Sequence, residues 1–322
     1  MNRTNTPAII ILAGPTASGK STLALALASR FGGEIVNADS MQVYRELRLL
    51  SARPTPDDEA RVPHHLYGFL SVCETCSAAD WAARARVVIS DIVAHRRIAF
   101  VVGGTGLYLK ALVDGLSPIP DVPPEIRAVA RARTKAEGSA ALHTELVRLD
   151  AAAAARIAPG DAQRVARAWE VVSATGRPLS DWQKHTPVDG LAGRAPAPLH
   201  RFVIAPPRDW LYDRCTRRLE RMVEDGALDE VRALDGLALP ADRPAAKALG
   251  VPQFQAHLRG DCDFSEALAA ATTATRRFAK RQTTWFRHQF GDWPTVAEKD
   301  SESFFNYFLS FIRDNVLTEK EL

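Results

Sequence analysis

The residues best suited to chemistry form one short stretch near the start of the chain, Gly14-Pro15-Thr16-Ala17-Ser18-Gly19-Lys20-Ser21. This stretch matches the phosphate-binding pattern G-x-x-x-x-G-K-[ST] at every fixed position. Its glycines let backbone N–H groups surround an anion, Lys20 adds a cation, and the Ser21 hydroxyl can bind a Mg²⁺ that bridges phosphate oxygens. Thr16 and Ser18 offer further donors. The alternative is a plain glycine turn, but the complete pattern predicts a site for a phosphorylated ligand.

A second candidate is Asp39, which precedes Ser40, Met41 and Gln42. Typical NTP-hydrolysing enzymes place another acid after a distant apolar strand to hold Mg²⁺. Here the apolar run Ile98 to Val102 ends in Gly103-Gly104-Thr105-Gly106 and carries no such acid. Asp39 is therefore the one well-placed carboxylate, and it can act as a general base, support Mg²⁺ through water, or cap a helix.

These residues require a parallel sheet to position them. The apolar runs Ala8 to Ala13, Glu34 to Ala38 and Ile98 to Val102 are typical of buried strands, and helices are predicted over Thr22 to Ala28 and Ala78 to His95. In such sheets ligands bind at the carboxyl ends of the strands. We therefore expect an α/β fold with a P-loop NTPase-like parallel sheet core.

The composition and hydrophobic spacing of the chain change at the proline-rich segment Ser117 to Pro124. The next ~75 residues show helical spacing and no strand candidate. The spacing predicts helices over Glu125 to Glu137, Ser139 to Leu149, Ala151 to Ala155 and Ala162 to Thr175. We expect an inserted all-helical domain at 118–199 and a core domain made of 1–117 and 200–322.

The core is expected to resume with a strand at Arg201 to Ala205 and basic helices at Arg208 to Glu224 and Phe264 to Phe290. The second helix has no acid between Arg276 and His288. A charged helix face can simply be solvated, and the net charge of +3 does not by itself indicate a nucleic-acid partner. The helical spacing of Phe304, Phe305, Phe308 and Ile312 in the tail favours packing over a site.

The composition is that of a soluble globular protein, with 46% apolar and 25% charged residues in 322. No apolar run reaches the ~18 residues of a membrane span, so a cytoplasmic protein is expected. The four cysteines do not suggest a disulfide framework, and Cys73 and Cys76 are expected to be free thiols and not zinc ligands.

Taken together, the motifs resemble those of the tRNA dimethylallyltransferases, also named tRNA isopentenyltransferases. The similarity covers about residues 8 to 290 and follows the order of the family's blocks. The matching blocks are Gly14 to Ser21, Asp39-Ser40-Met41-Gln42-Val43-Tyr44, Val102-Gly103-Gly104-Thr105-Gly106-Leu107-Tyr108, Asp161-Ala162-Gln163-Arg164 and Lys280-Arg281-Gln282-Thr283-Thr284-Trp285-Phe286-Arg287.

The resemblance implies transfer of a dimethylallyl group from dimethylallyl diphosphate to N6 of the adenine immediately 3′ of a tRNA anticodon. The loop Gly14 to Ser21 and Arg214 would bind the diphosphate, with Mg²⁺ on Ser21. Asp39 would be the general base, and Thr16 and Lys20 would complete the catalytic set. For Arg214, a surface ion pair is the alternative.

The resemblance also implies a surface for the tRNA anticodon stem-loop, on a protein expected to act as a monomer. Its residues would come from the loop after the second strand, the third strand end, the helical insertion and the long basic helix. They are Asp39, Ser40, Met41, Gln42, Thr105, Arg127, Gln163, Arg164, Val165, Ala166, Arg167, Lys280, Arg281, Gln282, Thr283, Thr284, Trp285, Phe286 and Arg287.

Two blocks depart from the family pattern. Leu249-Gly250-Val251-Pro252-Gln253 stands where Ile-Gly-Tyr-Arg or -Lys is common, which puts a tRNA contact there in doubt, and Leu50 to Pro54 replaces Gly-Thr-Ala-Lys-Pro with Arg53 keeping the charge. Two other functions remain open on the motifs alone: a small-molecule kinase using the loop for ATP, and an adenylate isopentenyltransferase acting on free nucleotide. A non-enzymatic nucleotide-binding scaffold is less consistent with Asp39 beside the loop.

Overall fold

The computed structural model describes residues 4–185, 187–298 and 300–318. The chain divides into two compact units, a larger one of residues 1–113 and 191–322 and a smaller one of 114–190. The sequence predicted the boundaries of the inserted domain at 117/118 and 199/200. The first lies four residues from the junction found in the structure, and the second lies nine residues from it. Each unit has its own buried core.

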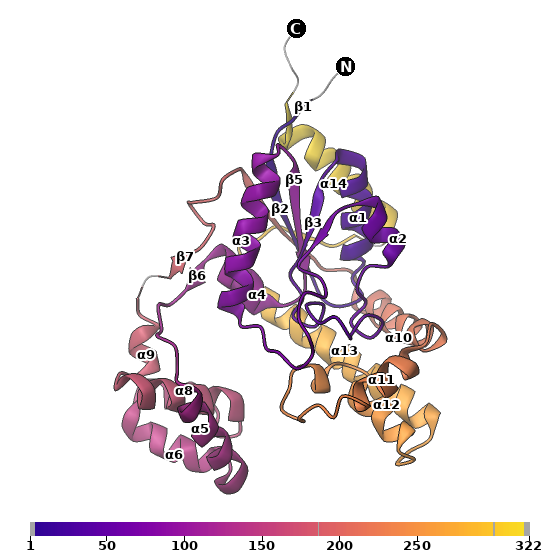
Figure 1. Ribbon diagram of the computed structural model, residues 1–322. Helices are drawn as coiled ribbons and strands as arrows, with labels where there is room; N and C mark the ends of the chain where they lie inside the picture. Colours follow the sequence, from indigo (N-terminus) through magenta and orange to yellow (C-terminus); the bar gives the residue numbers. More distant parts are fainter. Residues whose placement is uncertain (1–3, 186, 299, 319–322) are drawn as a thin grey trace. The chain divides into compact units, whose positions relative to one another are not determined.

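The larger unit contains a six-stranded sheet of order β4-β3-β5-β2-β8-β9, and every pairing in it is parallel. Figure 1 shows this sheet between helices. The strands are β2 (Ala8–Ala13), β3 (Glu34–Asn37), β4 (His64–His65), β5 (Ile98–Gly103), β8 (Leu199–Ile204) and β9 (Thr295–Val296). The expected α/β parallel-sheet core is therefore confirmed. The two-residue edge strands β4 and β9 were not predicted, because they are too short to show a pattern.

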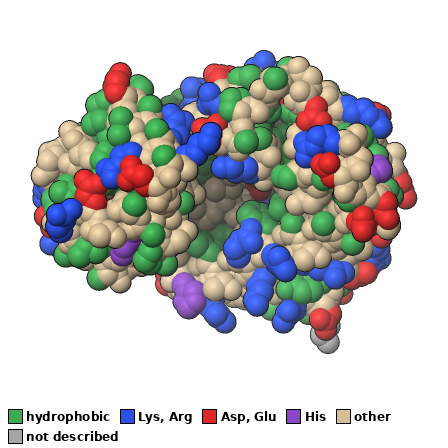
Figure 2. All heavy atoms as spheres, turned by 90° about the horizontal axis from the view of Figure 1, so that it is seen from below, with side chains coloured by type: hydrophobic (Ala, Val, Ile, Leu, Met, Phe, Trp, Pro, Cys, Tyr) green, Lys and Arg blue, Asp and Glu red, His purple; other side chains and the backbone are tan. Residues whose placement is uncertain are grey.

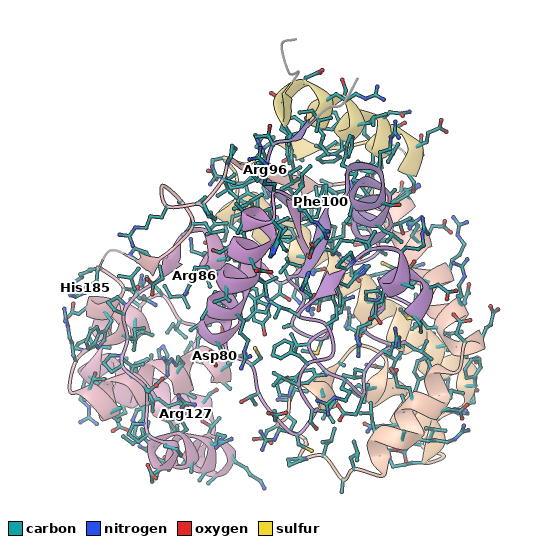
Figure 3. The ribbon with its side chains drawn as sticks, turned by 45° about the horizontal axis from the view of Figure 1, so that its top comes forward. Asp80, Arg86, Arg96, Phe100, Arg127 and His185 are labelled. Carbon is teal, nitrogen blue, oxygen red and sulfur yellow. The ribbon has the colours of Figure 1, made fainter. Side chains whose placement is uncertain are left out.

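The centre of the sheet is buried on both faces, which is why its strands are continuous apolar runs and not alternating ones. All six residues of β2 are buried. Helices α1 (Lys20–Phe31) and α14 (Ser301–Asn315) cover one face, and α3 (Ala78–Ala94) lies against the other (Figure 1). Phe100 of β5, labelled in Figure 3, belongs to the hydrophobic core that the sheet forms with α1 and α14, together with Phe308 and Ile312 of α14. The expected packing role of the tail is confirmed.

Most of the remaining helices of the larger unit lie beyond the carboxyl ends of the central strands (Figure 1). The remaining helices are α2 (Pro56–Arg61), α4 (Gly106–Val113), α10 (Arg208–Glu224), α11 (Ala227–Asp235), the 3₁₀ turn η1 (Ala245–Lys247), α12 (Val251–Leu258) and α13 (Phe264–Gln289). The start of α13 has a capping box in which Asp263 accepts from the Glu266 amide. A short antiparallel pair, β1 (Thr4–Asn5) with β10 (Leu317–Thr318), joins the two ends of the described chain.

The smaller unit consists of α5 (Pro124–Glu137), α6 (Ser139–Leu149), α7 (Ala151–Ala154), α8 (Ala162–Thr175) and α9 (Leu179–Trp182). Its buried Asp150 accepts from the amides of Ala153 and Ser180 and so ties α7 to α9. The expectation of no strand was wrong, because β6 (Gly115–Leu116) pairs antiparallel with β7 (Val188–Asp189). Two residues per strand are too few to produce a sequence period.

Two composition-based expectations can be compared with the structure. Cys73, Cys76, Cys215 and Cys262 are all free thiols. Among the described residues, no helix combines the length and apolar character that a bilayer crossing demands.

Candidate active site

The glycine-rich loop connects β2 to α1, the arrangement that the motif requires. Ala17 and Gly19 have φ values of 63° and 88°, so the backbone turns through left-handed conformations between Pro15 and Lys20. Gly14 has no room for a side chain, since a Cβ there would lie 2.8 Å from the Ile204 carbonyl oxygen. The Lys20 ammonium folds back over the loop and donates to the Pro15 carbonyl at 3.2 Å.

Three cations gather at this loop. Lys20 is joined by Arg214 of α10, which donates to the Ala17 carbonyl at 3.0 Å, and by Arg218 one turn later, which donates to the Thr16 hydroxyl at 2.5 Å. Within the described part of the chain, none of the three forms an ion pair with a carboxylate. Burial lowers the pKa of Lys20 to about 8, although the negative charge of Asp39 acts in the opposite direction. Such uncompensated cations favour an anionic ligand.

A cavity of about 520 Å³, here named the loop cavity, opens beside these groups. Lys20, Ser21, Arg53, Arg214 and Arg218 all line it. Ser18 does not line it, and its hydroxyl is buried with no hydrogen-bond partner among the described residues, so its role as a donor to a bound phosphate stays a prediction.

The residues around Ser21 fit a Mg²⁺ that is bound mainly by a substrate. The described residues contain no cluster of three His, Cys, Asp or Glu side chains able to hold a metal by themselves. Mg²⁺ commonly keeps several waters and takes one or two protein ligands plus substrate phosphates. The Ser21 hydroxyl in the loop cavity supplies one such oxygen.

Asp39 follows β3 and is held by its neighbours. Its amide donates to the Asn37 side chain at 2.8 Å, and its Oδ1 accepts from the Met41 amide at 2.9 Å. The segment after it forms turns, so Asp39 is not the cap of a helix. No donor among the described residues engages Oδ2, which leaves that oxygen able to accept a proton from a substrate.

A second cavity of about 320 Å³, here named the Asp39 cavity, contains this carboxylate. Its walls include Thr16 and Arg218 together with the mostly apolar side chains Met41, Leu50, Leu219, Met222, Leu249 and Phe278. Arg218 lines both cavities. A phosphorylated ligand in the loop cavity and an apolar or aromatic one in the Asp39 cavity would therefore meet at Arg218, which also donates to the Thr16 hydroxyl.

Thr105, at the end of β5, holds the Asp39 loop in place. Its amide donates to the Ala38 carbonyl at 3.2 Å, and its hydroxyl accepts from the Ser40 amide at 2.9 Å. Gly103 lets the two segments approach, because a Cβ there would lie 2.1 Å from the Ala38 oxygen. The predicted residues Asp39, Ser40 and Thr105 thus form one assembly. Gln42 is buried, and its side-chain amide donates to the carbonyls of Ser51 and Ala52, so this side chain holds the loop at those residues.

The block Lys280 to Arg287 lies on α13, and the helix divides it between two sides. Lys280, Arg281, Thr283, Thr284 and Arg287 are exposed. Gln282 and Phe286 are buried, with exposures of 6% and 2%, and Trp285 packs against Gly106. Figure 2 views the molecule from the side of α10 and α13 and shows Lys and Arg side chains over that face of the larger unit. A direct RNA contact is therefore open to the exposed members, whereas Gln282 and Phe286 belong to the interior.

The predicted RNA-binding residues of the smaller unit are also divided by burial. Arg127 on α5, labelled in Figure 3, is exposed, as are Gln163 and Arg164 at the start of α8. Val165 is fully buried in the core of this unit with Trp169, and Ala166 packs against the same core. Direct contact is available to the Arg and Gln side chains, and Val165 serves packing.

The resemblance places Arg218, like Arg214, at an arginine position of the family but implies a diphosphate contact for Arg214 alone, and it gives Lys247 no role. Both Arg218 and Lys247 line the Asp39 cavity. The i, i+4 spacing of Arg214 and Arg218 places them on one side of α10 and could have indicated a shared target. Leu249, from the block that departs from the family pattern, also lines this cavity.

Comparison with known proteins gives consistent matches. Residues 42–289 match the family model described as IPP transferase, and residues 7–65 match one described as isopentenyl transferase. The chain is 49% identical to a tRNA dimethylallyltransferase of Parvibaculum lavamentivorans, covering 96% of this chain and 97% of that one. It is 54% identical to a protein of the same name from Rhodospirillum centenum, covering 87% and 88%.

Among solved structures, a tRNA isopentenylpyrophosphate transferase from Bacillus halodurans superposes with a TM-score of 0.67 at 32% identity. The match covers 95% of this chain and 96% of that one.

Proposed function

Since the chain belongs to the IPP transferase family, we propose that its two neighbouring cavities bring the substrates of a tRNA dimethylallyltransferase together. The protein is an enzyme that transfers a dimethylallyl group from its diphosphate to an adenine of tRNA. The observation that carries the assignment of the site is the position of Arg218, which lines both cavities and donates to the Thr16 hydroxyl on the wall of the Asp39 cavity.

Dimethylallyl diphosphate occupies the loop cavity with its diphosphate against the loop amides, Lys20, Arg214 and Arg218. These cations have no carboxylate partners in the described residues, so a diphosphate supplies the charge they lack. Carbon is the electrophile in this reaction. The allylic C–O bond breaks with its electron pair going to the diphosphate, and the cations stabilise the growing negative charge. The dimethylallyl group points toward Thr16 and the Asp39 cavity.

A Mg²⁺ bound to the Ser21 hydroxyl and the diphosphate would neutralise part of the leaving-group charge. Ser21 fits this role because it lines the loop cavity beside Lys20. The chain's own contribution is to orient the diphosphate through Lys20 and Arg214, which both line this cavity.

Asp39 is the general base. The amine of adenine is a poor nucleophile, because its lone pair is delocalised into the ring, so removal of a proton during attack helps. As the new N6–C bond forms, the N6 proton passes to the free Oδ2 of Asp39. The apolar walls of the Asp39 cavity suit an unstacked base, which an enzyme acting on a nucleobase must take out of its stack.

The base modified is the adenine immediately 3′ of the anticodon, and the exposed basic residues of α13 and of the smaller unit bind the surrounding RNA. Arg and Lys side chains fix phosphates and set the register of the RNA without reading its sequence. Lys280, Arg281 and Arg287 serve the larger unit in this way, and the exposed Arg127 and Arg164 with the half-buried Arg167 serve the smaller one.

One incubation tests the proposal against its two competitors. The protein is mixed with unmodified tRNA, dimethylallyl diphosphate and Mg²⁺, and the digested RNA is examined by mass spectrometry for dimethylallyl-adenosine 3′ of the anticodon. Parallel reactions contain free AMP in place of tRNA, or ATP in place of dimethylallyl diphosphate. Modified tRNA without modified AMP is expected. Faster modification of AMP, or phosphate transfer from ATP, would favour the free-nucleotide or kinase reading.

A further inference from the structure

The side chain of Gln282 joins the two loops that flank the reaction centre. Its Oε1 accepts from the Thr16 amide at 2.8 Å, and its Nε2 donates to the Gly104 carbonyl at 2.7 Å. These partners lie 266 and 178 residues away in the sequence. Because the side chain is 6% exposed, both bonds are made away from bulk water.

The contact with Gly104 depends on the absence of a side chain there. A Cβ on Gly104 would lie 2.3 Å from the Gln282 Nε2 atom, and one on Gly106 would lie 2.2 Å from the Trp285 ring. Helix α13 therefore rests directly on the segment after β5 at two glycines. A buried amide with both ends satisfied has little freedom to move, because breaking either bond leaves a buried polar group unpaired.

From Gly104 the connection continues to Asp39 through the next residue. Thr105 donates its amide to the Ala38 carbonyl and accepts from the Ser40 amide, so it holds the residues on both sides of Asp39. On the other side of Gln282, Thr16 is bound through its hydroxyl by Arg218. Gln282 is thus the junction between the loop that binds the leaving group and the loop that carries the proton acceptor.

We propose that Gln282 is a positioning residue, which fixes the spacing between Thr16 and Asp39 through Gly104 and Thr105. This inference rests on the proposed function, in which an allylic carbon on one side must meet an amine on the other. Productive attack needs the reacting atoms about 3–3.5 Å apart, and a displacement of about 1 Å can cost about 10²-fold in rate. The role differs from the RNA contact that the sequence motif suggests for the same residue.

The decisive variant is Gln282→Met, which keeps the length of the side chain and removes both hydrogen bonds. Thr272→Val is its control, because Thr272 is also buried on α13 but lines neither cavity. We expect Gln282→Met to lower the single-turnover rate at saturating substrates by about 10–10²-fold. The Kd for unmodified tRNA stays unchanged, and the control keeps the wild-type rate.

Hydrogen exchange followed by mass spectrometry gives a readout that does not depend on activity. In Gln282→Met the Thr16 amide and the 103–106 segment should both exchange faster, while the α13 amides near Thr272 remain protected. A double-mutant cycle that combines Gln282→Met with Thr105→Val completes the test. If both residues act on one spacing, the rate loss of the double variant is smaller than the product of the single losses.

Two results would overturn the inference. One is a raised Kd for tRNA with a normal rate at saturating tRNA, which would make Gln282 an RNA contact. The other is a wild-type rate together with unchanged exchange at Thr16. A wild-type protein that failed to prenylate tRNA would instead contradict the proposed function, and the exchange comparison would still decide whether Gln282 holds the two loops.

Discussion

The guanidinium of Arg218 donates a hydrogen bond of 2.5 Å to the hydroxyl of Thr16 across 202 residues of sequence. Burial lowers the pKa of this arginine, and the charge of Asp39 opposes the shift. Arg218 lines both cavities and Thr16 lines the Asp39 cavity, so we expect the pair to contact the diphosphate oxygen that leaves the allylic carbon.

Arg218→Lys should therefore lower kcat more than it raises the Kd for inorganic diphosphate. Lysine keeps the charge but loses the planar fork that reaches Thr16 and a phosphate oxygen together. A loss of about 10–10³-fold in kcat is expected, in the range found when one stabilising donor is removed. Isothermal titration with inorganic diphosphate and steady-state kinetics separate the two effects. An unchanged kcat would remove Arg218 from the reaction.

The Lys20 ammonium should make diphosphate binding depend on pH. Its pKa is lowered to about 8 by burial, so the free enzyme loses this charge as the pH rises through that value. A bound diphosphate favours the charged form, and binding above pH 8 should therefore take up a proton. Affinity should fall between pH 7 and 9 in the wild type, as measured by titration in buffers of different ionisation enthalpy.

Lys20→Met supplies the control for this pH effect. It should weaken diphosphate binding and lower kcat/KM together, because the same charge serves the ground state and the transition state. The affinity for diphosphate that remains in this variant should not fall as the pH rises through 8. A step of equal size in the variant would assign the titration to another group.

Asp39→Ala and Asp39→Asn should each lower kcat by about 10²–10⁴-fold, the usual effect of removing a general base. Binding of inorganic diphosphate should persist, because the loop amides and the three cations remain. The fold should persist as well, since Asn can still accept from the Met41 amide as Asp39 Oδ1 does. Near wild-type kcat in both variants at saturating substrates would mean that the base is another residue.

The double variants Arg164→Ala/Arg167→Ala and Lys280→Ala/Arg281→Ala should each raise the Kd for tRNA. Each lost phosphate contact should also reduce the slope of log K against log salt by about 0.7–0.9. Inorganic diphosphate affinity should be unaffected. Arg30→Ala/Arg313→Ala is the matched control, because it removes two exposed charges from α1 and α14, outside the proposed RNA surface. Equal losses in all three would indicate a general charge effect.

The amino-acid sequence by itself determined the parallel sheet, the loop between β2 and α1, and the strand ends that carry Asp39 and Gly103 to Gly106. These features depend on neighbouring residues: a continuous apolar run favours a buried strand, and the glycine pattern allows the turns that follow it. The family resemblance depended on the same local blocks and needed no knowledge of distant contacts.

Only the tertiary structure decided which side of each helix faces inward. Lys280 to Arg287 is continuous in sequence, but the 3.6-residue period turns Ala279, Gln282 and Phe286 into the interior and leaves Lys280 and Arg281 exposed. The inward spacing could have been noticed, yet the partner of Gln282 could not, because it depends on how α13 packs on Gly104. Arg218 meets Thr16 for the same reason: contacts between residues this far apart are set by the packing of whole elements and leave no local pattern.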